Sequence, residues 1–286
     1  MSRAMTISGG AAAIIAASAV TLFPPFDDVS GVASPSAQEF SSGRKAFARF
    51  MTDPQNDVSQ LKQMGLSARA IEGADGTVLA SESDDECKGR GIYWLRDHGG
   101  TSLAITAPHR GSDRHTGTLA SALFLETEAK VAAWNSAPRR ANDKCPYGLD
   151  LARERHHLFS AFNLGFADAA PDGLIVQLHG FEGERRHSQA ARDAGIIVSD
   201  GTQKPGTRLY DFADCLSIAF APAPVLVYPG DTAELGALTN AQGQLLRENG
   251  FDGFVHLEIS APLREAMVED GALRAKLAGC LRKAAG

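Results

Sequence analysis

Several signatures of well-known protein classes are missing from this chain of 286 residues. It has no run of Lys and Arg, and its formal net charge is -6, so a face built to bind nucleic-acid phosphates is not expected. It has neither a GxxxxGK loop for phosphate nor a GxSxG turn for a serine nucleophile. P-loop enzymes and serine hydrolases are therefore disfavoured, and no nucleic-acid partner is predicted.

Cysteine is also scarce, with only Cys87, Cys145, Cys215 and Cys280 present. No two of them form a CxxC pair, which argues against a cysteine zinc site or a thioredoxin-type motif. An even number allows two disulfide bonds in an exported protein, with the connectivity left open. In a reduced compartment, the same four residues would be buried thiols.

The chain lacks an apolar run of the ~20 residues that cross a bilayer. The longest such run, residues 11–23, follows a short positive region at Arg3 and precedes Pro24 and Pro25. This pattern predicts a signal peptide and linker over residues 1–38, with cleavage around Ala33 or Ala37, and hence export to the periplasm or the extracellular space. No membrane span is expected after signal removal. The alternative is an Ala-rich disordered tail of a cytosolic protein.

The rest of the chain, residues 39–286, reads as one domain in which a β-meander precedes alternating helices and strands. Such an order predicts an α/β fold with a mixed, mostly parallel sheet and helices on both faces. The expected meander strands are residues 67–73, 77–83, 91–97 and 102–108. The later expected strands are 174–178, 196–199, 225–228 and 254–260, and the expected helices are 44–52, 118–134, 150–169 (capped by Asp150), 242–248 and 262–283.

Three of these strands carry metal-binding or acid–base residues at or near their carboxyl ends, where open α/β sheets bind ligands. His109 follows strand 102–108, His179 ends strand 174–178, and Glu258 lies within strand 254–260 on the same face as His256. Catalytic zinc takes three His or carboxylate ligands and leaves one position for water. His109, His179 and Asp113 could bind the metal, with Glu258 as the general base.

The same segments resemble a known group of enzymes. ITAPHRGSDRHTGTLA, LIVQLHGF and HLEISAPLRE resemble the metal-binding and catalytic motifs of bacterial poly-γ-glutamate hydrolases and N-formylglutamate amidohydrolases, which are related to zinc carboxypeptidases. The resemblance covers roughly residues 66–268. It implies a phosphorylase/hydrolase-like α/β fold, one zinc ion and a catalytic Glu258.

The resemblance is imperfect at the third ligand. Zinc carboxypeptidases have an acidic ligand three residues after the first His, where this chain has Ser112. Asp113 lies four residues after His109 and is favoured on ligand chemistry, with His115 as the competitor.

A further segment, WNSAPRR, lies where the carboxypeptidase relatives have an Asn-Arg pair that contacts the substrate. The resemblance therefore implies that Asn135 with Arg139 or Arg140 binds a substrate carboxylate or the scissile carbonyl. The alternative is a solvated turn with two surface arginines.

The function predicted from these residues is hydrolysis of an amide bond by zinc-activated water. The bond could be a peptide, a γ-glutamyl or an N-acyl amino acid amide, in a small molecule, a peptide or a polymer. The competing hypothesis is a non-catalytic exported binding module that keeps the hydrolase fold.

Overall fold

The structure, a computed structural model, describes residues 34–52, 59–71, 76–82 and 87–286. Within these residues nine strands form one sheet in the order β1-β2-β3-β5-β4-β6-β9-β7-β8. Most of the predicted signal peptide lies outside the described residues. The strands are β1 (Ser67–Ala70), β2 (Thr77–Ser81), β3 (Ile92–Arg96), β4 (Thr101–Ala107), β5 (Ala129–Trp134), β6 (Leu174–Phe181), β7 (Ile196–Ser199), β8 (Val225–Val227) and β9 (Phe254–Ser260).

The sheet confirms the predicted fold class. The central pairs β5–β4, β4–β6 and β6–β9 are parallel, whereas β1, β2 and β3 form an antiparallel meander at one edge. Strand β7 runs antiparallel to β9 and parallel to β8. The sheet is therefore mixed and parallel at its centre, which is where the ends of β4, β6 and β9 meet.

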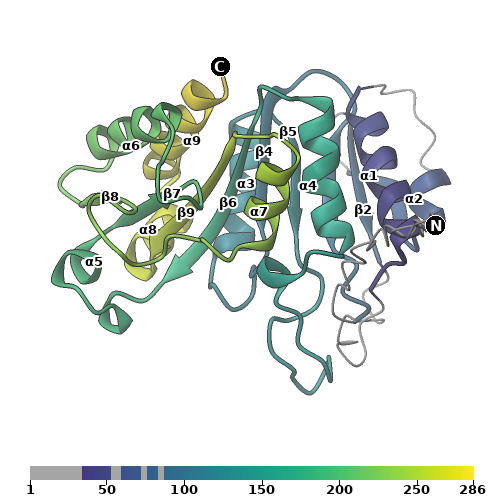
Figure 1. Cartoon of the computed structure of the whole chain (residues 1–286), viewed down its shortest axis with the longest axis horizontal. Helices are drawn as coiled ribbons and strands as arrows, with labels where there is room; N and C mark the ends of the chain where they lie inside the picture. The colour runs from purple at the N-terminus through teal and green to yellow at the C-terminus, as the bar shows by residue number, and fades with distance from the viewer. Residues whose placement is uncertain (1–33, 53–58, 72–75, 83–86) are drawn as a thin grey trace, which may run out of the picture.

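Helices cover both faces of the sheet (Figure 1). One face packs against α1, α4 and α7, and the other packs against α3, α6, α8 and α9. The helices are α1 (Ala37–Thr52), α2 (Ser59–Gln63), α3 (Thr116–Glu126), α4 (Leu158–Ala169), α5 (Gln189–Asp193), α6 (Thr207–Ala219), α7 (Ala241–Glu248), α8 (Ala261–Glu269) and α9 (Gly271–Ala285), with short 3-10 turns η1 (Leu151–Arg153) and η2 (Gly183–Arg185).

The two-residue period of β6 and β9 decides which side chains reach each face. In β6, Val176 and Leu178 lie in the apolar cluster under α3 and α9, and Leu257 of β9 joins them there. Gln177 and His179 alternate with them and therefore point to the opposite face, toward the side of α4 and α7. Each fully buried Leu or Val stabilises the fold by roughly 1.5–3 kcal/mol, so this register is strongly specified.

The predicted helix over residues 118–134 is wrong at its C-terminal half. Helix α3 ends at Glu126, where Thr127 caps it and Glu128 takes a left-handed φ of 54°. Residues 129–134 instead form β5, which is inserted between β3 and β4. The run AKVAAW is mostly buried. Because both faces of this strand are covered, it lacks the alternation of apolar and polar residues that usually indicates a strand.

Two other helix predictions were too long. Helix α4 begins at Leu158 with His157 as its N-cap, and Asp150 does not cap it. The predicted helix 262–283 is divided at Asp270, whose Oδ1 accepts hydrogen bonds from the backbone of Ala272 and Leu273. In both cases a polar side chain, that of His157 or Asp270, accepts a hydrogen bond from the backbone N–H of the following residues. This bond starts a new helix there and competes with one continuous helix.

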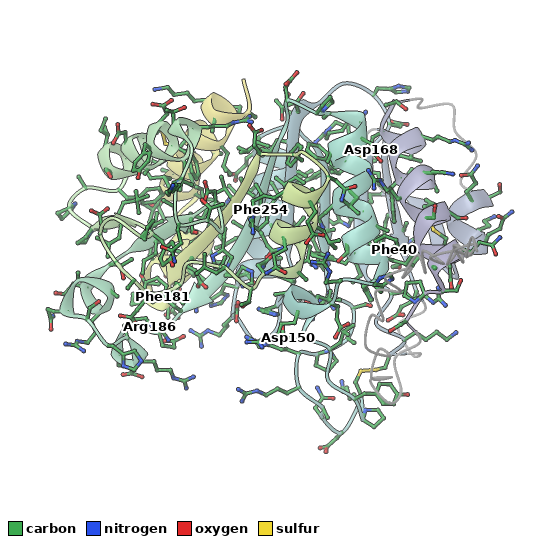
Figure 2. All side chains as sticks on the ribbon, viewed as in Figure 1. Phe40, Asp150, Asp168, Phe181, Arg186 and Phe254 are labelled. Atoms are coloured by element: carbon green, nitrogen blue, oxygen red, sulfur yellow. A yellow bond between two sulfur atoms is a disulfide. The ribbon has the colours of Figure 1, made fainter. Side chains whose placement is uncertain are left out.

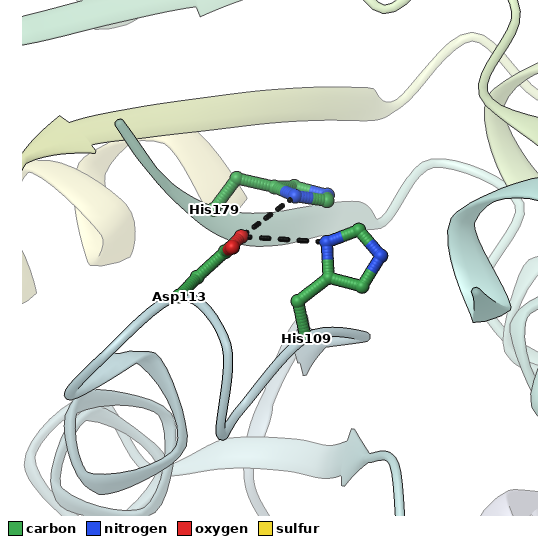
Figure 3. Close-up of side chains that lie close together, drawn as sticks. All are labelled: His109, Asp113 and His179. Carbon is green, nitrogen blue, oxygen red and sulfur yellow. Dashed lines mark ion pairs between the residues drawn. The ribbon is translucent and has the colours of Figure 1, made fainter. Parts of the chain in front are cut away.

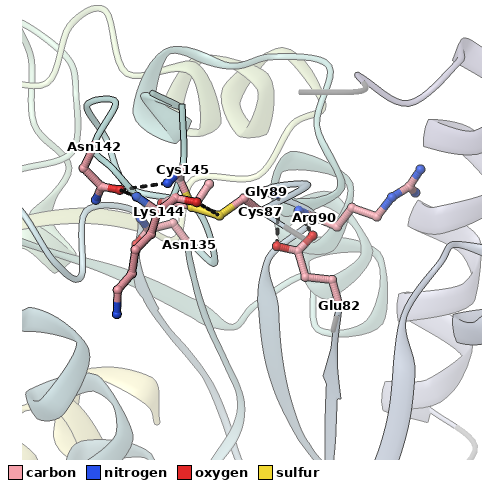
Figure 4. The surroundings of a disulfide bond; sticks show 9 residues. Glu82, Cys87, Gly89, Arg90, Asn135, Asn142, Lys144 and Cys145 are labelled. Carbon is pink, nitrogen blue, oxygen red and sulfur yellow. Dashed lines mark hydrogen bonds between the residues drawn. A yellow bond between two sulfur atoms is a disulfide. The ribbon is translucent and has the colours of Figure 1, made fainter. Parts of the chain in front are cut away.

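Disulfide bonds join Cys87 to Cys145 and Cys215 to Cys280. The second links α6 to α9. The first holds the long loop between β5 and α4 against the chain that leads into β3 (Figure 4). In that loop, Oδ1 of Asn142 accepts hydrogen bonds from the backbone of Lys144 and Cys145 at 3.0 and 2.9 Å. No helix within the described residues has the length and apolar character to cross a bilayer.

Candidate metal centre

The carboxyl ends of β4, β6 and β9 bring the predicted residues to one place. His109 lies two residues beyond β4, and His179 of β6 is paired in register with Glu258 of β9. Because these strands are parallel neighbours, their carboxyl ends share one edge of the sheet. The register also places Gln177 beside His256.

His109, Asp113 and His179 form a compact buried cluster (Figure 3). Oδ2 of Asp113 lies 3.4 Å from Nδ1 of His109 and 3.3 Å from Nδ1 of His179. The two imidazole rings lie 4.9 Å apart at their centroids and are nearly perpendicular. The three side chains are 3, 9 and 4% exposed, so two nitrogens and one carboxylate oxygen converge in an enclosed site.

The turn after β4 positions Asp113. Its backbone N–H donates to the carbonyl of His109, and its own carbonyl accepts from the N–H and the hydroxyl of Thr116. Oδ2 of Asp113 also accepts a hydrogen bond from Gly180 N at 3.2 Å, which ties the turn to the end of β6. Burial alone would raise the pKa of Asp113, but its interactions with His109 and His179 hold the pKa well below its ordinary value.

Asp150 supports His109 from the other side of the ring. Oδ1 of Asp150 lies 2.7 Å from Nε2 of His109, and Oδ2 accepts bonds from Nε and Nη2 of Arg139 at 3.0 and 2.8 Å. Burial alone would raise the pKa of Asp150, but its bonds to His109 and Arg139 lower it to about 2. An ionised carboxylate only accepts, so a neutral His109 ring carries its proton on Nε2 and presents a lone pair at Nδ1.

That lone pair decides which ligand the cluster fits. Nδ1 of His109 is buried and has no hydrogen-bond partner among the described residues, and it faces the ionised carboxylate of Asp113. When the His109 ring is neutral, two acceptors face each other in a buried site, and a cation between them removes their repulsion. Two imidazole nitrogens and one carboxylate oxygen are the donor set of catalytic zinc, so these residues fit the metal that the motifs imply.

Glu258 and His256 lie beside this cluster. A carboxylate oxygen of Glu258 and a ring nitrogen of His256 both lie within 4.8 Å of a ring nitrogen of His179. Burial and the charge of Asp113 raise the pKa of Glu258 to about 8, and its Oε2 has no hydrogen-bond partner among the described residues. Burial and the charge of His179 keep the pKa of His256 well below its ordinary value.

The two alternatives for the third ligand lie in different places. Asp113 lies between the two histidines, whereas His115 is the N-cap of α3, with a left-handed φ of 74°, and is half-buried. Neither cluster of possible metal ligands found in the described residues includes His115. His256 belongs to the second such cluster, with His179 and Glu258.

These residues open onto a cleft of about 1070 Å³. Both Asp150 and Arg186 line it, and Figure 2 shows them along the same edge of the molecule. Six arginines line the cleft, and they outnumber its five carboxylic acids. The arginines are Arg139, Arg140, Arg153, Arg185, Arg186 and Arg264.

The predicted substrate-binding residues separate in the structure. Asn135 is 3% exposed, and its side chain accepts a hydrogen bond from Arg110 N and donates one to the carbonyl of Ala137. It therefore braces the turn that follows His109. Arg139 lines the cleft with its Nε and Nη2 bonded to Asp150, and Arg140 is exposed at the rim.

Arg186 is a further charged residue of the cleft, and the motifs did not indicate it. It follows η2 and lines the cleft. Its positive charge lowers the pKa of Glu258 and so opposes the larger effect of burial. Its Nη1 lies 3.9 Å from Oε2 of Glu234, and its Nε has no hydrogen-bond partner within the described part of the chain. The only signal in the sequence was its closeness to His179 along the chain.

Comparison with known proteins finds similarity in three-dimensional structure. No protein-family profile matches the chain, and no curated protein matches it. A metallo-carboxypeptidase from Burkholderia cenocepacia has 11% identity, a TM-score of 0.41 and coverage of 79% of this chain and 67% of its own. A bacteriophage poly-gamma-glutamate hydrolase has 13% identity, a TM-score of 0.40 and coverage of 82% of this chain and 96% of its own.

A protein from Shewanella denitrificans OS-217, named as a candidate carboxypeptidase A, has 15% identity and a TM-score of 0.43, with 77% of this chain covered. The match spans 64% of that protein, so this chain covers less than two thirds of its length. Two of these three similar structures are named as carboxypeptidases and one as a poly-gamma-glutamate hydrolase.

Proposed function

We propose that this chain is an exported, zinc-dependent hydrolase of amide bonds. His109, Asp113 and His179 bind one zinc ion, with Nδ1 of each histidine and a carboxylate oxygen as donors. The observation that carries this proposal is the buried, unpartnered Nδ1 of His109 facing the carboxylate of Asp113. When bound, zinc lowers the pKa of a water molecule toward about 7 and polarises the scissile carbonyl.

In the proposed reaction Glu258 moves the proton. It takes a proton from the attacking water and hands it to the leaving amine. Its position supports this role, because it lies close to His179 and has an oxygen without a partner among the described residues. Its pKa of about 8 means that the metal-free protein holds it protonated at pH 7, and a cation nearby would favour the ionised form that accepts a proton.

The proposed substrate carries a carboxylate near the scissile amide. The excess of arginines in the cleft supports this, as a guanidinium binds a carboxylate through two parallel hydrogen bonds. Arg139 uses its Nε/Nη2 edge on Asp150, so we assign the role predicted for it to Arg186, which lines the cleft and whose Nη1 lies 3.9 Å from Glu234. Peptides, γ-glutamyl compounds and N-acyl amino acids all meet this description.

Export rests on the two disulfide bonds and on the predicted signal peptide. Disulfides persist in oxidising compartments and are rare in the cytosol, so both bonds favour a periplasmic or extracellular location.

The experiment that tests the function is metal analysis of the purified full chain by mass spectrometry, beside Asp113→Ala, His179→Ala and the control His115→Ala. We expect about one zinc per chain, lost in the first two variants and kept in the control. Zinc retained by Asp113→Ala but lost by His115→Ala would move the third ligand to His115. No metal in the native protein, even after zinc is supplied, would contradict the proposed mechanism. Zinc without hydrolysis of any amide in a broad panel would favour a binding module.

A further inference from the structure

Gln177 is a fully buried amide in the middle of the sheet. It lies on β6, two residues before His179 and therefore on the same face of the strand. Its side chain is 0% exposed, so each of its polar atoms must find a partner inside the protein. Oε1 of Gln177 lies 2.9 Å from Nε2 of His179, on the side of the ring opposite Asp113.

Gln242 determines which end of this amide faces His179. Nε2 of Gln242 donates to the carbonyl of Leu151 at 2.8 Å and to the hydroxyl of Ser160 at 2.9 Å. A backbone carbonyl only accepts, so the nitrogen of Gln242 must face Leu151 and its oxygen must face Gln177. Nε2 of Gln177 then donates to Oε1 of Gln242 at 3.2 Å, which turns Oε1 of Gln177 toward His179.

The contacts of Asn240 independently determine the same orientation of the Gln177 amide. Asn240 is the N-cap of α7, and its Oδ1 accepts a hydrogen bond from Gly243 N at 2.9 Å. A backbone N–H only donates, so the nitrogen of Asn240 must point the other way. It donates to Oε1 of Gln177 at 2.5 Å. Two chains of hydrogen bonds that begin at fixed backbone groups therefore agree on the orientation of Gln177.

We infer that Gln177, held by Gln242 and Asn240, is a positioning residue that keeps the imidazole proton of His179 on Nε2 and its Nδ1 lone pair aimed at the metal position. The amide oxygen of Gln177 can only accept, so the ring nitrogen beside it must donate. This inference rests on the proposed function, because the purpose of the fixed lone pair is to bind zinc. Partners that orient metal-bound histidines typically change metal affinity about 10–100-fold when they are removed.

A purely structural role makes a different prediction. If Gln177 only fills a buried polar position, every disruptive substitution should lower stability and leave zinc affinity unchanged. If it positions His179, affinity should follow the presence of an acceptor at this site. Gln177→Leu removes the acceptor, whereas Gln177→Glu keeps one at nearly the same volume.

The control is Asn163→Leu. Asn163 is a buried amide on α4 that donates to the carbonyl of Phe159 and does not line the cleft. We expect all three substitutions to lower the melting temperature of the chain. In zinc competition with a chromophoric chelator, Gln177→Leu should lose about 10–100-fold in affinity. Gln177→Glu and Asn163→Leu should stay close to the native protein. Equal zinc affinity in Gln177→Leu and the native chain would overturn the inference.

A second measurement needs no variant of Gln177 to fold. In the metal-free native chain, labelled with ¹⁵N at histidine, the His179 signals identified by their loss in His179→Ala should show the proton on Nε2. A proton on Nδ1 would overturn the inference, even in a chain that binds zinc. A native chain that binds no zinc would instead contradict the proposed function, while the observed tautomer would still decide the role of Gln177.

Discussion

Oδ1 of Asp150 lies 2.7 Å from Nε2 of His109, although the two residues are 41 positions apart in the chain. The same carboxylate accepts two hydrogen bonds from Arg139, so its orientation is fixed from both sides. A histidine whose second nitrogen donates to a carboxylate is a better metal ligand, because its ring is oriented and its basicity is raised. Asp150 is therefore as much a part of the candidate metal centre as the three residues that would contact the ion.

Substitution Asp150→Asn should weaken zinc binding without unfolding the protein. The amide is nearly isosteric but has lost the charge that holds Arg139 and favours the Nε2 proton of His109. We expect a loss of about 10–100-fold in zinc affinity, measured by competition with a chelator. Arg153→Gln is the matched control, because Arg153 lies 3.8 Å from Asp150 and its side chain is 73% exposed. Unchanged affinity in Asp150→Asn would show that Asp150 does not support the metal site.

Substitution Glu258→Gln should abolish turnover and leave zinc bound. General acid–base groups contribute roughly 10²–10⁴-fold to rate, so we expect kcat to fall by about that factor. Metal content by mass spectrometry and hydrolysis of a carboxylate-bearing amide check the two halves of the prediction. Full activity in Glu258→Gln would make the base assignment wrong.

The same variant should alter the pH dependence of stability in the metal-free protein. The pKa of Glu258 rises from its ordinary value of 4.5 to about 8 on folding, so the folded chain holds a proton that the unfolded chain has released. The contribution of Glu258 to the free energy of unfolding is fully present below about pH 4.5 and is lost as the pH rises toward 8. Glu258→Gln does not titrate, so its melting temperature should exceed that of the native chain increasingly from pH 5 to 8, by roughly 2–4 °C per kcal/mol. Parallel melting profiles across this range would contradict the buried, protonated state.

Arg186→Gln should selectively impair substrates that carry a carboxylate. Paired substrates, one with the free acid and one with the corresponding carboxamide, separate charge recognition from catalysis. We expect KM for the acid to rise by at least about tenfold, the equivalent of roughly 1.4 kcal/mol, while the carboxamide is little affected. Arg185→Gln is the control, because Arg185 is adjacent, exposed and also at the cleft. An equal effect on both substrates would exclude Arg186 as the carboxylate-binding residue.

Removal of the disulfide between Cys87 and Cys145 should destabilise the chain and the cleft together. The bond closes a loop with a sequence separation of 58 residues, for which the chain-entropy relation gives about 4 kcal/mol. The loop that it holds carries Arg139 and Asp150. We therefore expect Cys87→Ser with Cys145→Ser to lower both the melting temperature and the zinc affinity. Removal of Cys215–Cys280, which joins α6 and α9, should lower the melting temperature alone.

Local pattern was sufficient for the elements whose burial is simple. Strands β7 and β9 have the predicted bounds, because a short apolar run bounded by turn residues predicts a buried strand without knowledge of its neighbours in space. The predicted helix over 118–134 failed because the run that became β5 is buried between two other strands, and that pairing is a long-range event. Helix α6 was not predicted, since its polar residues obscure the apolar positions that pack on the sheet.

For the candidate site, the sequence by itself determined the chemistry: two histidines, an acidic residue and a glutamate at or near the ends of buried strands. Their roles as ligands and base remain predictions. Tertiary structure decided that Asp113, and not His115, lies between the two histidines. It also brought Asp150 to His109 and Gln177, Asn240 and Gln242 to His179. Strand order and the path of the loops set these contacts. Neither produces a pattern in the local sequence, because hydrogen bonds between residues far apart in the chain depend on the tertiary structure that brings them together.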